Sequence, residues 1–213
     1  MENKIYSKVF LWLFIGMLVT FLTGIYTTTN ESALSVIFSG GFYWILVIVE
    51  LGLAIFLSAR IHKMSATTAR ICYLLYTFLT GLTFSSIFIV YKLESILLVF
   101  GITSLLFLIF AIIGKTTNID LSKLSTYLLM MLLGIIICSI VNIFLKSSTF
   151  DIVISCISIV VFLGYIAYDV QKIKRLNGLI TEDNLAVIGA FELYLDFINI
   201  FIDLLRLFGK ADD

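Results

Sequence analysis

Proline is absent from the 213-residue chain, and charged residues make up only 13% of it. A soluble domain usually carries about 25% charged residues, so the shortage argues against a water-soluble globular protein. The formal net charge is zero, which argues against nucleic acid as a partner. Without proline, any kink in a helix must come from Gly, Ser or Thr.

The residues that most often bind metals or form disulfides are also scarce. The three cysteines, Cys72, Cys138 and Cys156, all lie in apolar runs, and their spacing indicates neither a metal site nor a disulfide framework. We interpret them as packing residues. The single histidine, His62, lies in a basic stretch, and we interpret it as solvated.

Long apolar runs dominate the chain instead, since hydrophobic residues make up 61% of it. A membrane-spanning helix needs about 20 mostly apolar residues. Seven stretches meet this requirement, and the connections between them are short and polar: 8–28, 42–61, 71–91, 95–114, 124–145, 150–171 and 185–208. The sequence therefore predicts an all-α membrane protein of seven transmembrane helices, forming a single domain over residues 1–213.

The distribution of Lys and Arg predicts the orientation. If the N-terminus is cytoplasmic and all seven segments cross, ten of the fourteen basic residues lie on the cytoplasmic side. The positive-inside rule therefore favours a cytoplasmic N-terminus. A re-entrant last segment would change the bias to twelve against two, so the side of the C-terminus stays open. The short chain, without a retention signal, favours a bacterial plasma membrane.

The last segment carries a stripe of polar residues. Successive members are four, three, four and three residues apart, which places them on one helical face: Glu192, Asp196, Asn199, Asp203 and Arg206. A charge at the centre of a span costs at least about 2.5–3.5 kcal/mol. We therefore expect this helix to be buried among the others. A helix lying on the membrane surface is the alternative, but such helices usually have a broad Lys-rich face.

A further acidic residue, Asp169, lies near the cytoplasmic end of segment 150–171. Asp196 enters the last segment from the same side, so we hypothesise that the two carboxylates face each other. Ionising two close carboxylates at once costs free energy because the like charges repel, so one pKa rises and the pair titrates as a unit. Deprotonated, it offers oxygen ligands that suit Ca²⁺. The simpler interpretation, a helix-end carboxylate neutralised by Lys172 or by water, also stays open.

Segment 42–61 supplies complementary charges, Glu50 and Arg60. They are ten residues apart, as are Asp196 and Arg206, which corresponds to about 15 Å along a helix. Antiparallel alignment brings Arg60 level with Asp196, and Glu50 level with Arg206. We therefore expect Arg60 to act as a latch on the pair formed by Asp169 and Asp196, and Glu50 to form an ion pair with Arg206.

Several stretches of the chain together form a specific pattern: Ile48–Glu50, Thr80–Thr83, Tyr168–Asp169, Gln171–Lys174, Ile180–Asp183, Leu193–Ile202 and Leu204–Arg206. At these residues the sequence resembles the Bax inhibitor family, the transmembrane Bax inhibitor motif proteins, and most closely its bacterial calcium-leak members. The chain departs from the family pattern in having Ser86 where many members have proline, and Asp203 where close relatives often have Asn.

The resemblance implies a seven-helix fold in which the last helix is central. It also implies a pH-sensitive calcium leak governed by Asp169 and Asp196, with Arg60 as the latch and Glu50 and Arg206 as a buried ion pair. We expect Ca²⁺ as the transported or bound ion, held by the two aspartates. We expect no other cofactor, and a monomer surrounded by lipid.

Two other functions stay open. One is an interaction protein that modulates other membrane machinery in stress or cell-death regulation, with membrane-protein partners that the sequence does not identify. The other is an intramembrane aspartyl protease, because those enzymes also use two membrane-embedded aspartates. They require Gly-x-Gly-Asp at the second aspartate, where this chain has Leu193-Tyr-Leu-Asp196, so we expect no enzymatic activity.

Overall fold

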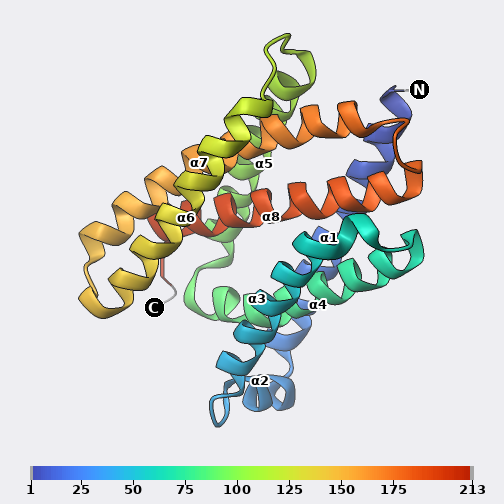
Figure 1. Ribbon diagram of the computed structural model, residues 1–213. Helices are drawn as coiled ribbons and strands as arrows, with labels where there is room; N and C mark the ends of the chain where they lie inside the picture. Colours follow the sequence, from blue (N-terminus) through green and yellow to red (C-terminus); the bar gives the residue numbers. More distant parts are fainter. Residues whose placement is uncertain (1, 212–213) are drawn as a thin grey trace. The chain divides into compact units, whose positions relative to one another are not determined.

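The computed structural model describes residues 2–211, which fold into helices joined by short turns (Figure 1). The α-helices are α1 (Glu2–Thr29), α2 (Glu31–Phe38), α3 (Phe42–Arg60), α4 (Ala66–Val90), α5 (Leu93–Thr116), α6 (Ser122–Leu145), α7 (Ser148–Leu176) and α8 (Glu182–Phe208). A short 3-10 helix, η1 (Ile61–Lys63), follows α3. Within the described residues, seven helices are long and apolar enough to cross a membrane. The predicted all-α membrane protein is therefore confirmed.

Six of the seven spanning helices begin before the apolar stretches that predicted them. The structure begins α4 at Ala66 rather than at residue 71, because the side chain of Ser65 caps its first turn. The Ser65 hydroxyl accepts a hydrogen bond of 3.2 Å from the Thr68 N–H. Such a cap satisfies one of the N–H groups that the start of a helix leaves without a partner. Polar first turns of this kind are invisible to a search for apolar runs.

Helix α2 was not predicted at all. It has only eight residues, about 12 Å of helix, which is too short to cross a membrane. The side chain of Asn30 caps it by accepting a hydrogen bond of 3.1 Å from the Ala33 N–H. After α2 the chain turns into α3 through Gly40 and Gly41, whose positive φ values of 54° and 83° favour glycine.

The chain divides into two compact units. The first contains the described residues up to Lys92, then Leu176–Tyr194 and Ala211. The second contains Leu93–Arg175 and Leu195–Lys210. Helix α8 thus contributes its first half to one unit and its second half to the other.

In the first unit, α1 and α4 pack closely because a glycine lies between them. A Cβ atom added at Gly81 would lie 2.5 Å from Cβ of Thr23 and 2.8 Å from the carbonyl oxygen of Thr20. The Thr20 hydroxyl lies 2.5 Å from the hydroxyl of Tyr194, which brings α8 into the same core. Small residues that allow close backbone approach are typical of packing between membrane helices.

In the second unit, α5 and α7 meet at a similar close approach. A Cβ atom added at Gly114 would lie 2.3 Å from the carbonyl oxygen of Ala167. Aromatic rings of α5 and α8 pack together in the same unit, with ring centroids of Phe100 and Phe107 lying 5.4 Å and 5.8 Å from that of Phe197. These distances are in the range of favourable aromatic pairs.

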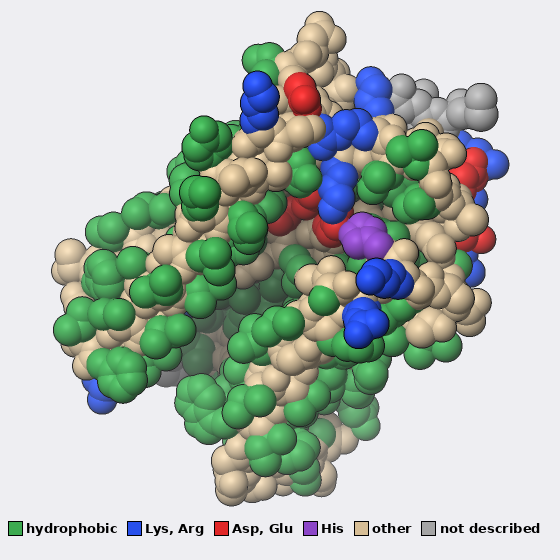
Figure 2. All heavy atoms as spheres, in the orientation of Figure 1, with side chains coloured by type: hydrophobic (Ala, Val, Ile, Leu, Met, Phe, Trp, Pro, Cys, Tyr) green, Lys and Arg blue, Asp and Glu red, His purple; other side chains and the backbone are tan. Residues whose placement is uncertain are grey.

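Helix α8 is the most buried of the seven candidate spans. Its apolar window is 78% buried, whereas no other span exceeds 44%. This agrees with the prediction that the polar last helix lies among the others. Elsewhere, hydrophobic side chains cover much of the visible surface (Figure 2), as expected of helices that face lipid.

Candidate functional site

The two aspartates that the sequence singled out are both buried. Asp169 on α7 is 5% exposed and Asp196 on α8 is 4% exposed, and both belong to the second unit. Each of the two carboxylates interacts electrostatically with the phenol of Tyr165. Tyr165 lies one helical turn before Asp169 on α7. The two acidic groups therefore share a neighbour in the second unit.

Sequence reasoning assigned no role to Tyr165. The signal that identifies it is the four-residue spacing from Asp169, which places both side chains on one face of α7. A phenol carries one hydroxyl that both donates and accepts hydrogen bonds. It therefore suits either the protonated or the ionised form of a carboxylate.

The end of α7 that follows Asp169 is fixed to the connection between α5 and α6. The side-chain amide of Gln171 donates a hydrogen bond of 2.8 Å to the carbonyl oxygen of Ile119, and its oxygen accepts one of 2.9 Å from the Leu121 N–H. Arg175 forms an ion pair of 2.9 Å with Asp120. These contacts hold the α7 backbone in place two to six residues beyond Asp169.

Asp120 itself lies outside the candidate spans. Hydrogen bonds from the hydroxyl and the N–H of Ser122 lower its pKa, with a smaller contribution from the charge of Arg175. Arg175 also contacts the Ser122 hydroxyl, and its guanidinium lies 5.5 Å from the ring centroid of Tyr168. The connection between α5 and α6 is therefore held by charged, solvent-accessible contacts.

Toward the other end of α8, Asp203 has a partner that the sequence did not suggest. A guanidinium nitrogen of Arg206 donates a hydrogen bond of 3.4 Å to Oδ1 of Asp203 and one of 3.2 Å to the hydroxyl of Ser155 on α7. The Asp203 side chain is 10% exposed, against 45% for Arg206. The buried carboxylate of Asp203 is thus neutralised by the more exposed guanidinium of Arg206, three residues further along the same helix.

Glu50 and Arg60, the partners predicted for Arg206 and Asp196, both lie in the first unit. Oε2 of Glu50 on α3 accepts a hydrogen bond of 2.8 Å from the hydroxyl of Thr83 on α4. Arg60 is exposed at the last residue of α3. The ion pair between Glu50 and Arg206, and the latch contact of Arg60, stay predictions.

The remaining members of the polar stripe also have contacts. Oε1 of Glu192 lies 3.7 Å from Nε2 of His62 on η1, and the His62 side chain is 43% exposed, in agreement with its interpretation as a solvated residue. The side-chain amide of Asn199 donates a hydrogen bond of 2.7 Å to the carbonyl oxygen of Leu195, one turn earlier on α8. Asn199 is therefore satisfied within its own helix.

An ionic cluster joins α1, α4 and the start of α8 in the first unit. Lys8 lies 2.8 Å from Glu182 and 3.3 Å from Asp183, and Arg70 lies 3.1 Å from Asp183. The guanidinium of Arg70 also lies 5.4 Å from the ring centroid of Trp12. This cluster gives a physical role to the Ile180–Asp183 stretch, because it ties the first turn of α8 to two other helices.

Calcium usually takes six to eight oxygen ligands. Among residues 2–211, no group of three or more His, Cys, Asp or Glu side chains is arranged to hold a metal ion. The expectation that Asp169 and Asp196 hold Ca²⁺ stays a prediction.

Seven apolar helices, with buried aspartates on the last two, define an all-α integral membrane protein. The family described as "Inhibitor of apoptosis-promoting Bax1" matches residues 2–213, so the chain belongs to the Bax inhibitor family. The resemblance noted in the sequence is therefore confirmed.

Bacterial membrane proteins are among the relatives. The inner membrane protein YbhL of Escherichia coli strain K12 is 41% identical, over 96% of this chain and 90% of the relative. An uncharacterized protein of Borreliella burgdorferi is 40% identical, over 98% and 93%. An uncharacterized membrane protein of Streptococcus pyogenes serotype M1 is 34% identical, over 98% and 92%.

Proposed function

We propose that this protein is a pH-sensitive calcium leak of a bacterial plasma membrane, with its N-terminus in the cytoplasm. The observation that carries the proposal is the burial of Asp169 and Asp196 in one compact unit, where both carboxylates act electrostatically on the phenol of Tyr165. Acidic residues inside a membrane protein are costly, and they usually mark an ion pathway or a proton-linked site. Cation passage with proton control is the function that such a pair suits best.

The mechanism follows from the chemistry of the pair. When both aspartates are ionised, their oxygens attract Ca²⁺. When a proton is shared between them, the negative charge falls and the cation is held less tightly. Arg60 is the proposed latch, which competes with the cation for the ionised pair. Protonation would therefore weaken cation binding and also release the latch, and these two effects change the flux in opposite directions.

Calcium flux into liposomes loaded with a calcium-sensitive dye tests the proposal. We expect Asp169→Asn and Asp196→Asn each to abolish the pH dependence of the flux. Asp151→Asn, the same change in the first turn of α7, is the matched control and should behave like wild type. If both site variants keep the flux and the pH profile of wild type, the proposal is refuted.

The latch needs a separate measurement. If release of Arg60 dominates, acidification raises the wild-type flux, and Arg60→Ala makes the flux high at every pH. If weaker cation binding dominates, acidification lowers the flux in both proteins, and more steeply in Arg60→Ala, where no release of a latch opposes it. Equal pH profiles in the two proteins would remove Arg60 from the mechanism while leaving the aspartate pair in it.

An interaction protein is the second candidate, because the description of the family names inhibition of an apoptosis-promoting protein. Such a role depends on surfaces that partners reach rather than on buried carboxylates. Capture of membrane proteins that depends on the connecting loops, and is unchanged in Asp169→Asn and Asp196→Asn, would favour it.

A further inference from the structure

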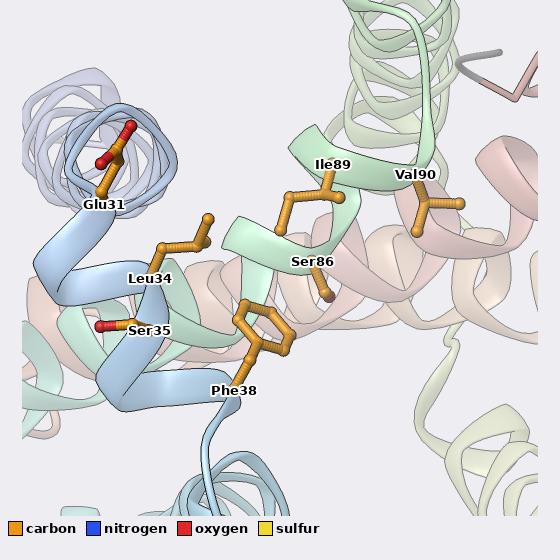
Figure 3. A pocket seen from close by; sticks show the side chains of 7 residues that line it. All are labelled: Glu31, Leu34, Ser35, Phe38, Ser86, Ile89 and Val90. Atoms are coloured by element: carbon orange, nitrogen blue, oxygen red, sulfur yellow. The ribbon is translucent and has the colours of Figure 1, made fainter.

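A groove lies between α2 and the last turns of α4, in the first unit (Figure 3). Its volume is about 460 Å³, within the range of about 300–1,000 Å³ that is usual for ligand pockets. Leu34 and Phe38 line it from α2, and Ile89 and Val90 line it from α4. These four side chains give the groove an apolar wall on both sides.

The hydroxyl groups in the lining are already used within the protein. The Ser35 hydroxyl donates a hydrogen bond of 2.9 Å to the carbonyl oxygen of Ser32. The Ser86 hydroxyl donates one of 2.7 Å to the carbonyl oxygen of Thr83. The groove therefore offers apolar contact rather than hydrogen bonds, and its natural occupant is a hydrocarbon.

The position of the groove along the helices determines where that hydrocarbon comes from. It adjoins the last turn of α4, a membrane-spanning helix that ends at Val90. Helix α2 directly follows α1, another span, which ends at Thr29. In the predicted topology both ends lie on the outer side of the membrane, at the level where acyl chains meet headgroups. A lipid of the surrounding bilayer reaches the groove without leaving the membrane.

Glu31 adds a charge to one end of the groove. Among the described residues that line it, Glu31 alone is ionisable. It is exposed, in the first turn of α2, and Figure 3 shows its carboxylate at the opposite end of α2 from Phe38. A carboxylate at headgroup level attracts a cationic group and repels an anionic one.

We propose that this groove binds one acyl chain of a bilayer phospholipid whose headgroup carries an amine, with the ammonium group beside Glu31. The site does not depend on the calcium leak, because none of its residues belongs to the aspartate pair. The bound chain would fill the gap between the short helix α2 and the end of α4.

Native mass spectrometry tests the site. The full-length protein is reconstituted in vesicles of equal parts phosphatidylethanolamine and phosphatidylglycerol, then extracted in mild detergent. We expect wild type to retain one phosphatidylethanolamine per chain. Leu34→Trp and Val90→Trp fill the groove from opposite walls, and each should reduce this adduct at least about five-fold. Val36→Trp places the same side chain at a residue of α2 that is 59% exposed and outside the groove lining, and it should match wild type.

Glu31→Gln separates the headgroup from the chain. The adduct should persist, while the preference for the amine lipid falls by about two- to five-fold, as expected for loss of one exposed ion pair. Equal adducts in wild type and both groove-filling variants would overturn the acyl-chain site. A preference for phosphatidylglycerol, or an unchanged preference in Glu31→Gln, would overturn the role of Glu31.

Discussion

Gly114→Ala is the most direct test of the packing that positions Asp169. The added Cβ atom would lie 2.3 Å from the carbonyl oxygen and 2.7 Å from the Cα atom of Ala167. Both are backbone atoms, so no side-chain rotation relieves the contact. Restoring a separation of 3.0 Å requires α5 and α7 to move apart by about 0.7 Å. Overpacking of this kind typically costs about 1–3 kcal/mol.

Thermal unfolding in detergent micelles measures this cost, and we expect the midpoint of Gly114→Ala to fall by several degrees. Gly101→Ala is the matched control on the same helix, since a Cβ atom there has no neighbour within 4 Å. Its midpoint should stay the same or rise slightly, because Ala favours helices over Gly. Equal midpoints for the two variants would refute the close approach. Under the proposed function, the displaced α7 should also alter the calcium flux, because Ala167 is two residues before Asp169.

Two further predictions concern charges at opposite ends of the second unit. Arg206→Met should destabilise the protein by about 1–3 kcal/mol, because it leaves the buried Asp203 carboxylate without the charge that neutralises it. Asp203→Asn leaves only a half-exposed arginine without its partner, so it should cost less than about 1 kcal/mol. Thermal unfolding of both variants tests this order, and the reverse order would contradict the assigned contact. The pKa of Asp120 is lower in the folded protein than in the unfolded chain. Its contacts therefore stabilise the folded state above the pKa of the unfolded chain, and this stabilisation is lost as the pH falls through the pKa of the folded protein. The two proteins, wild type and Asp120→Asn, should therefore differ in unfolding midpoint at pH 7. The difference should begin to shrink below about pH 4 and vanish only below the lowered folded pKa, and a difference that is unchanged in strong acid would contradict it.

The seven spans were predictable because apolar length is a strong signal in a chain with so few charges. Helix ends were not, since they depend on individual caps such as Ser65. Helix α2 was missed because eight residues are too few to stand out by hydrophobicity. The Asn30-Glu31 pair before Leu34 is nevertheless a recognisable start signal for a helix, and attention to caps would have found it.

The candidate site was predictable as a set of residues but less so as a set of contacts. Spacing placed five polar residues on one face of α8, and the cost of charge in lipid led us to expect that this helix is buried. The structure adds that Asp196 and Asp203 are themselves buried. Depth along the membrane suggested Glu50 on another helix as a partner for Arg206, but it did not consider Asp203, three residues earlier on the same helix. The contact between His62 and Glu192 joins positions 130 residues apart, and no local pattern in the sequence predicts it.

The burial of α8 has a consequence for how the protein is made. Chains are synthesised from the N-terminus, so this helix leaves the ribosome after the six other spans that the structure describes. It is the most protein-covered span and carries the polar stripe, so lipid alone is a poor environment for it. Its stable partners exist only once the earlier helices have inserted. We therefore expect insertion of α8 and assembly of the tertiary structure to be coupled, and a chain interrupted before α8 lacks both Asp196 and Asp203.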